Sequence, residues 1–257
     1  MTSPMILQAE GIHKRFGNNE KLKGISVTAS KGNVISIIDS SGSGKSTFLR
    51  CLNLLEKPNA GRFGLDGKEL APVPSKDGSV KVSSPAQLQR LRSQVSMVFK
   101  HFNLWAHTTA IENVIDAPIH ALKLTKAEAT ERADAYLPRV GVYHRKDAFP
   151  AHLSGCEQQR VAIARALAMA PKVMLFDEPT CALAPELVGE VLRVIRSVAV
   201  EGHTISVVSH EMGYAREVSN KVVFLHKGRI KEQGDPKEIL ARPATKRLKE
   251  FLSNSIK

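Results

Sequence analysis

The chain has 257 residues, and 42% of them are hydrophobic, which is enough for a full core in one α/β domain or one domain with a subdomain. No apolar run approaches the roughly 18 residues that a membrane span needs, and the first residues lack a signal-peptide pattern. The formal net charge of +12 favours an acidic partner, but the basic residues are scattered and not interleaved with aromatics, so we expect no nucleic acid to bind.

The first third of the chain predicts strands with one helix. Short strands are expected between residues 6 and 36, and an apolar strand over 34–38 leads into a helix that starts near Lys45 and runs to about Leu55. Residues 61–67 predict a strand that enters a tight turn. The Pro, Ser, Gly and Lys residues of 71–85 predict an exposed excursion.

The rest of the chain alternates helices with buried strands. After a helix over 85–91, residues 103–160 are predominantly helical, and Thr125-Lys126-Ala127-Glu128 predicts a capped helix start. Apolar runs predict strands at 95–99, 173–176, 204–209 and 221–225, the last of them followed by a basic C-terminal helix. Such alternation predicts a mostly parallel sheet covered on both faces, with the helical middle segment inserted into it.

A phosphate-binding loop is the clearest motif. The segment Asp39–Thr47 reads DSSGSGKST, with an apolar strand before it and a helix after it. Glycines let backbone N–H groups turn around an anion, and the helix N-terminus adds partial positive charge. We expect Lys45 to reach the β- and γ-phosphates and Ser46 to hold Mg²⁺. The predicted nucleotide contacts are Ser40, Ser41, Gly42, Ser43, Gly44, Lys45, Ser46 and Thr47.

Two carboxylates follow the apolar strand at 173–176. Asp177 is placed to hold Mg²⁺, and Glu178 is placed to activate water for attack on a γ-phosphate. Paired acids are common in solvated loops, but with a phosphate loop upstream they indicate a nucleotide hydrolase.

Over essentially its whole length the chain resembles the ATP-binding subunits of ABC transporters. The residues similar to the signature, Walker B and switch-histidine regions are Leu153-Ser154-Gly155 with Gln158-Gln159-Arg160, Asp177-Glu178-Pro179-Thr180 and Ser209-His210-Glu211. Finer similarity to the polar amino-acid uptake subfamily lies in Lys76-Asp77-Gly78, in 101–105, in 187–193 and in 210–216.

The resemblance implies a P-loop NTPase core with an antiparallel β-subdomain and an inserted helical subdomain. It also implies one nucleotide-binding domain over 1–257, with a core at about 1–99 and 161–235, the helical subdomain at about 100–160 and a C-terminal helix at about 236–257. By the same resemblance, Phe16 stacks on adenine, Ser154 and Gly155 contact the nucleotide across a dimer, and His210 contacts the γ-phosphate. The cofactors implied are ATP and Mg²⁺.

The partners follow from the same family. We expect a homodimer, or a dimer with a homologous subunit, beneath membrane-spanning permease subunits that a periplasmic or surface solute-binding protein supplies. The chain would then lie at the cytoplasmic face of the plasma membrane. Three cysteines without metal or disulfide spacing fit that reducing compartment.

Several motif positions depart from the family. Asp39 replaces the first glycine of the phosphate loop, and its carboxylate would repel phosphate. Lys100 stands where the family has a Gln that contacts Mg²⁺ and water, and an ammonium can neither ligate a cation nor accept a hydrogen bond. Cys156-Glu157 replaces Gly-Gln in the signature, where a side chain would crowd a backbone contact and add negative charge.

The D-loop also departs, because Ala184 replaces an Asp. Losing one preorganised group commonly costs on the order of 10²-fold in rate, and the sequence offers no candidate for a compensating contact. We therefore predict a transport ATPase whose hydrolysis is impaired. The alternatives are a fully active amino-acid importer ATPase and a non-catalytic nucleotide-binding partner subunit.

Overall fold

The computed structural model describes residues 4–39, 42–70, 72–74, 80–82 and 84–255. Ser40 and Ser41 of the phosphate loop lie outside the described residues, as do residues 71, 75–79 and 83 of the predicted excursion, which include the segment 76–78. The described part of that excursion contains the strands β6 (Pro72–Pro74) and β7 (Val80–Val82), which pair with each other.

A six-stranded sheet forms the centre of the molecule, in the order β12-β11-β3-β10-β9-β8. Neighbouring strands from β11 to β8 run parallel, and β12 runs antiparallel to β11 at one edge. The strands are β3 (Val34–Asp39), β8 (Val95–Val98), β9 (Val173–Asp177), β10 (Thr204–Val208), β11 (Lys221–His226) and β12 (Arg229–Gly234). This mostly parallel sheet confirms the predicted fold class.

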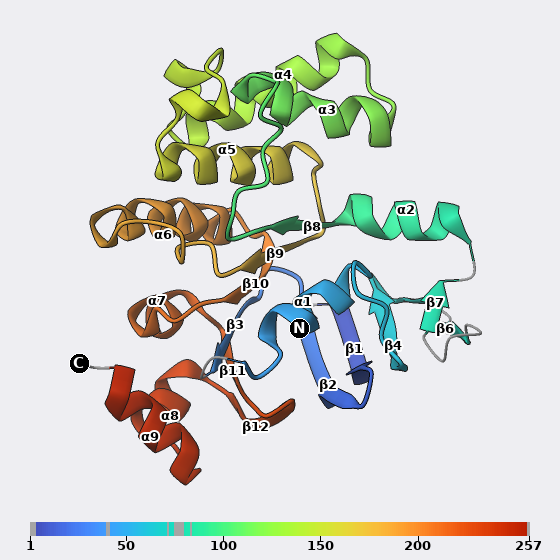
Figure 1. Ribbon diagram of the computed structural model, residues 1–257, viewed down its shortest axis with the longest axis vertical. Coiled ribbons are helices and arrows are strands. Elements are labelled where there is room, and N and C mark those ends of the chain that lie inside the picture. The colour runs from blue at the N-terminus through green and yellow to red at the C-terminus, as the bar shows by residue number, and fades with distance from the viewer. Residues whose placement is uncertain (1–3, 40–41, 71, 75–79, 83, 256–257) are drawn as a thin grey trace.

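Both faces of the central strands are buried, which explains their unbroken apolar runs. On β9, Met174 and Phe176 join the core beneath the helices α3 (Ala110–Leu122), α4 (Lys126–Arg139), α5 (Gly155–Ala168) and α6 (Pro185–Val200). Their neighbours Val173 and Leu175 join a second core with α1 (Lys45–Leu52) and the antiparallel sheet. Figure 1 shows the sheet between these two layers.

The antiparallel sheet has the order β2-β1-β4-β5, with β1 (Met5–Phe16), β2 (Asn19–Ser30), β4 (Ala60–Leu65) and β5 (Lys68–Leu70). The expectation of short strands is wrong here, because β1 and β2 each have 12 residues. Their pairing shifts register at several points, including between Ala9 and Ile12, so the alternation of apolar residues is broken along the sequence. The predicted turn after β4 is present, with positive φ at Asp66 and Gly67 as in a type I′ hairpin.

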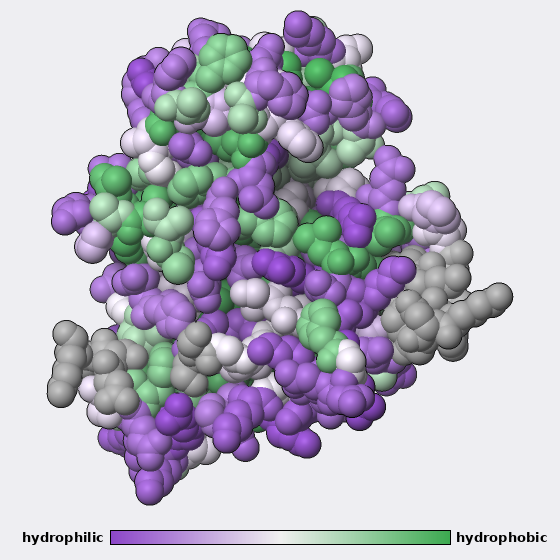
Figure 2. Space-filling view, in the orientation of Figure 1, coloured by the Kyte–Doolittle hydropathy of each residue, from purple (hydrophilic) through white to green (hydrophobic). Residues whose placement is uncertain are grey.

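Three helices form the layer at the top of Figure 1: α3 (Ala110–Leu122), α4 (Lys126–Arg139) and α5 (Gly155–Ala168). Each begins with a capping box, and the one predicted at Thr125 and Glu128 is confirmed. The helices α6 (Pro185–Val200) and α7 (Met212–Val218) lie between this layer and the lower part of the molecule. The space-filling view of the same face is largely hydrophilic, with its apolar patches mainly over the helical half (Figure 2).

Helix boundaries differ from expectation at three places. α1 (Lys45–Leu52) ends before Leu55, because Leu54 adopts a left-handed conformation, whereas α2 (Pro85–Gln94) runs past 91. The C-terminal region holds the edge strand β12 and two helices, α8 (Pro236–Ala241) and α9 (Lys246–Ser255), where one helix was expected. The sequence does not predict β12, because this strand alternates exposed and half-buried residues, as a one-sided edge strand does. Within the described part of the chain, none of the helices combines the length and apolarity needed to cross a membrane.

Candidate functional site

The phosphate loop links the end of β3 to the start of α1. Gly44 has a φ of 107°, and a Cβ on it would lie 2.8 Å from the Cδ2 atom of Leu22, so only glycine fits. Among the described residues, no side chain caps α1 and no acidic residue lies in its first turn. The N–H groups of that turn are therefore available to an anion, as the sequence predicts.

The loop is held by two distant segments that sequence reasoning missed. The ammonium of Lys21, on β2, donates to the carbonyl of Gly42 at 2.6 Å. The N–H of Gly228, in the turn between β11 and β12, donates to the carbonyl of Ser43 at 3.1 Å. No motif marks either residue, because both contacts depend on how the two sheets meet.

Asp39 lies beside the lysine of the loop. Its side chain is fully buried, and one carboxylate oxygen lies 3.7 Å from Nζ of Lys45, which is itself buried. Asp39 is expected to repel phosphate directly. It also weakens the attraction between Lys45 and phosphate, because the cation that would bind phosphate is already close to an anion.

Asp177 ends β9 with its side chain buried. Its Oδ2 atom lies 3.5 Å from Nη2 of Arg50 on α1, and its Oδ1 atom has no hydrogen-bond partner among the described residues. A buried carboxylate oxygen without a donor suits a divalent cation, so the arrangement fits Mg²⁺ held by Asp177 and Ser46. The described residues contain no group of three or more His, Cys, Asp or Glu residues that could hold a metal ion.

Glu178 and His210 are brought together at the ends of β9 and β10. Oε1 of Glu178 lies 3.6 Å from Nε2 of His210. Glu178 has a φ of 50°, a strained conformation for a non-glycine residue, as is often found at functional sites.

Positive neighbours act on the Glu178 carboxylate. The interaction with His210 is the largest cause that lowers the pKa of Glu178, and the charges of Lys45 and Lys100 lower it further against the opposing effect of burial. Glu178 is therefore ionised at neutral pH but is a weaker base than a carboxylate without those cations. Lys100, half-buried, is thus placed close enough to influence the predicted catalytic base.

The loop that carries Lys100 is anchored to the signature helix. Both amino groups of the Arg165 guanidinium, on α5, donate to this loop, one to the carbonyl of Phe102 at 2.8 Å and the other to that of Asn103 at 2.7 Å. Phe102 and Asn103 both have positive φ, so the loop turns sharply just after Lys100.

Ser154 and Gly155 start α5. The Ser154 hydroxyl accepts the N–H of Glu157 at 3.3 Å, and the Glu157 carboxylate accepts the N–H of Ser154 at 2.8 Å. A Cβ on Gly155 would lie 3.3 Å from Leu183, so the signature packs closely on the D-loop. Among the described residues, no hydrogen bond or ion pair joins Ser154 or Gly155 to the phosphate loop.

Glu157 and Cys156 differ from the sequence-based expectation. Glu157 closes the capping box and lies 3.6 Å from the Arg145 guanidinium and 3.8 Å from His144, so its charge is largely compensated within the chain. Cys156 is buried, and its Sγ donates to Glu190 on α6 at 3.3 Å. The expectation that this side chain crowds a backbone contact is not supported, because it points into the protein.

The Glu190 carboxylate links the signature helix to α6. Glu190 also lies 3.5 Å from Arg160, so one carboxylate joins two residues of α5 to α6. Burial, followed by the Glu190 carboxylate, raises the pKa of Cys156 to about 11. The other free cysteine of this region, Cys181, is exposed.

Ala184 is the N-cap residue of α6 and supplies no side-chain hydrogen bond. The family Asp at this position would cap the helix, so the departure has a structural cost besides any catalytic one.

Phe16, at the end of β1, is 48% exposed, with Nζ of Lys14 4.7 Å from its ring centroid. One side of that ring is thus covered by a cation.

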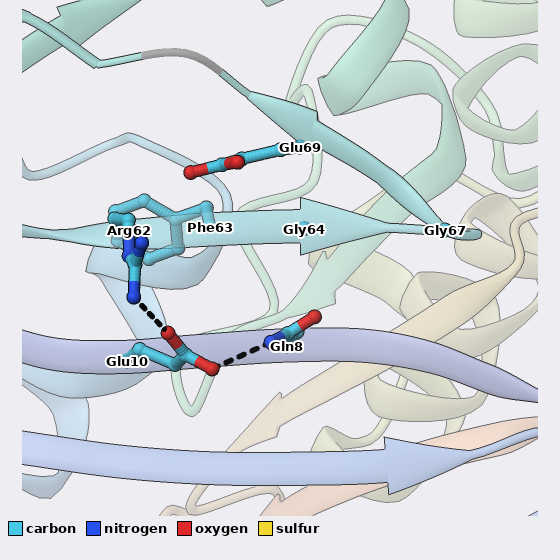
Figure 3. Close-up of a pocket in the computed structure, with 7 residues that line it drawn as sticks. All are labelled: Gln8, Glu10, Arg62, Phe63, Gly64, Gly67 and Glu69. Atoms are coloured by element: carbon cyan, nitrogen blue, oxygen red, sulfur yellow. Dashed lines mark hydrogen bonds and ion pairs between the residues drawn. The ribbon is translucent and has the colours of Figure 1, made fainter.

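A separate pocket of about 330 Å³ lies on the antiparallel sheet (Figure 3). There Glu10 accepts from Gln8 at 2.6 Å and from Arg62 at 2.8 Å, while Glu69 faces them from the next strand. None of the predicted site residues lines this pocket.

The chain is similar to known proteins over nearly its whole length. The family model described as ABC transporter matches residues 22–181. The arginine/ornithine transport ATP-binding protein AotP of Pseudomonas aeruginosa is 64% identical over 251 residues, covering 98% of this chain and 99% of that protein. The histidine/lysine/arginine/ornithine transport ATP-binding protein HisP of Salmonella typhimurium is 55% identical over 258 residues, covering all of both chains.

Two solved structures have the same fold. The structure of cbiO1 from Clostridium perfringens, part of the ABC transporter complex cbiONQ, has a TM-score of 0.79 and 31% identity, covering 93% of this chain and 92% of its own. A dimeric ATP-binding cassette bound to ADP and phosphate has a TM-score of 0.76 and 29% identity, covering 90% of this chain and 99% of its own.

Proposed function

Because this chain belongs to the ABC transporter ATP-binding family, we propose that it is the nucleotide-binding subunit of an importer for polar amino acids. The family implies that the chain binds ATP. The finer assignment is supported by the names of relatives with 55–64% identity, which concern transport of arginine, ornithine, histidine and lysine. The solute itself is selected by other subunits of such a transporter.

The proposed assembly has two nucleotide-binding chains below two permease subunits at the cytoplasmic face of the membrane. The dimeric cassette with the same fold supports the dimer. In this assembly the signature residues Ser154 and Gly155 face the nucleotide of the second chain. We assign residues at about 100–160 to a helical subdomain that, with the loop at 99–105, contacts the permease, and about 236–257 to a C-terminal helical segment.

In the proposed reaction, the chain's own residues have separate tasks. Lys45 and the N–H groups of the first turn of α1 hold the phosphates, and Phe16 stacks on adenine. Ser46 and Asp177 would hold Mg²⁺, which neutralises phosphate charge when bound. Glu178 accepts a proton from water, and His210 orients Glu178 and contacts the γ-phosphate.

Hydrolysis is slowed, and the cause lies in the chain's own phosphate site. The observation that carries this proposal is the 3.7 Å approach of Asp39 to Lys45, which opposes phosphate binding at a buried lysine. Lys100 adds to it, because its charge lowers the pKa of Glu178 further, beyond the larger effects of His210 and Lys45. The changes at Cys156 and Glu157 contribute less, since both side chains have partners within the chain.

Measuring phosphate release from Mg-ATP tests whether the phosphate site or the signature limits hydrolysis. The double variant Asp39→Gly/Lys100→Gln should turn over at least tenfold faster than the natural chain, because it restores the phosphate site and the catalytic base. The matched variant Cys156→Gly/Glu157→Gln should change the rate less than threefold, and Glu178→Gln in the double variant should abolish turnover.

Two results would contradict the proposal. If the natural chain already turns over within about tenfold of the typical enzyme rate of 10 s⁻¹, it is an active importer ATPase. If only the signature variant recovers activity, then the dimer contact limits the rate.

A further inference from the structure

Arg50 is a residue near the metal ligands that no motif assigns. Its Nη2 atom lies 3.5 Å from Oδ2 of Asp177, whose side chain is only 2% exposed. A buried carboxylate is costly without a positive partner, so this guanidinium offsets part of the cost of burying Asp177.

The position of Arg50 along α1 places it beside the second metal ligand. Ser46 and Arg50 are four residues apart in one helix and therefore lie on the same face, one turn apart. That face is turned toward the end of β9, as the contact with Asp177 shows. The guanidinium and a cation on Ser46 would consequently border the same carboxylate.

Arg50 is not held firmly in this place. Its side chain is 42% exposed, and its buried Nε atom has no hydrogen-bond partner among the described residues. A long side chain with one ion pair and access to solvent can withdraw without breaking the core.

We propose that Arg50 competes with the divalent cation for Asp177 and so sets the metal affinity of the nucleotide site. The inference rests on the proposed function, since it concerns the Mg-nucleotide site described above. Binding of the cation requires the guanidinium to give up Oδ2 or to share the carboxylate with a second positive charge, which like-charge repulsion opposes. Arg50 therefore acts as a positioning residue through Asp177 and touches neither nucleotide nor water in the reaction.

Mn²⁺ serves as the probe, because its free form can be counted by electron paramagnetic resonance in the presence of ADP. Arg50→Gln should tighten Mn²⁺ binding about fivefold, the size expected for a partly exposed ion pair. ADP binding in EDTA, followed by calorimetry, should stay the same. Arg50→Lys should tighten Mn²⁺ binding about twofold, because a lysine lacks the planar fork of arginine.

Arg196→Gln is the matched control, since it removes the same charge from an ion pair of the same 3.5 Å length, with Glu217, on the surface. It should leave Mn²⁺ affinity unchanged, whereas Asp177→Asn should weaken it at least tenfold. Circular dichroism checks the fold, and if Arg50→Gln does not fold, Arg50→Lys decides the question.

Unchanged or weaker Mn²⁺ binding in the Arg50 variants would overturn the inference while leaving the proposed function intact. An equal change in ADP binding without metal would also overturn it, because Arg50 would then act on the nucleotide. If the natural chain binds neither ADP nor Mn²⁺, the proposed function fails and the inference with it.

Discussion

The missing cap of α6 allows a quantitative prediction. Ala184 is the N-cap residue of this 16-residue helix, with φ −63° and ψ 144°, and its side chain makes no capping bond. These angles are those that a capping residue adopts, and the position is exposed, so a polar side chain fits without rearrangement. Ala184→Asp should therefore stabilise the protein.

The expected gain is about 1 kcal/mol from the side-chain hydrogen bond to the first turn. The negative charge adds about 0.3 to 1 kcal/mol through the helix dipole. For a chain of this size, 1 kcal/mol corresponds to roughly 2–4 °C in Tm. Ala184→Ser should give the hydrogen-bond part alone, about 1 kcal/mol.

Differential scanning calorimetry on the three proteins provides the test. Thr125→Ala, which removes the cap of α4, calibrates the assay and should lower Tm by a comparable amount. If Thr125→Ala lowers Tm while both substitutions at 184 leave it unchanged, then α6 does not need a cap, and the argument from its backbone geometry is wrong.

Two further outcomes are expected. Burial raises the pKa of the Cys51 thiol to about 12, and burial with the Glu190 carboxylate raises that of Cys156 to about 11, so N-ethylmaleimide at pH 7.5 should label only the exposed Cys181. Mass spectrometry of the native and the unfolded chain checks this, and labelling of Cys156 in the native chain would contradict its burial. Asp39→Asn should tighten ADP binding on the order of tenfold in calorimetry, because it removes an anion beside the phosphate-binding lysine. The same variant should lower Tm, since it leaves a buried ammonium without that carboxylate, and unchanged ADP affinity would show that Asp39 does not oppose phosphate.

Short sequence patterns predict much of this fold. The apolar runs of β3, β9, β10 and β11, the glycines of the phosphate loop and the cap at Thr125 each depend on residues close together in the chain, so their spacing alone predicts the element. The order of strands and helices then requires a parallel sheet, since parallel neighbours need crossover connections. The sequence therefore determines which residues end at the carboxyl edge of the sheet, including Asp177 and Glu178.

Only the tertiary structure decides where the side chains at that edge point. Lys21 reaches the phosphate loop from β2, Arg50 reaches Asp177 from α1, and Cys156 turns inward to Glu190 on α6. These contacts join residues 21 to 127 positions apart, and they depend on how two sheets and several helices pack against each other. Helical and strand periodicity fixes the face of an element on which a residue lies, but the partner on the facing element is set by the packing of the whole core.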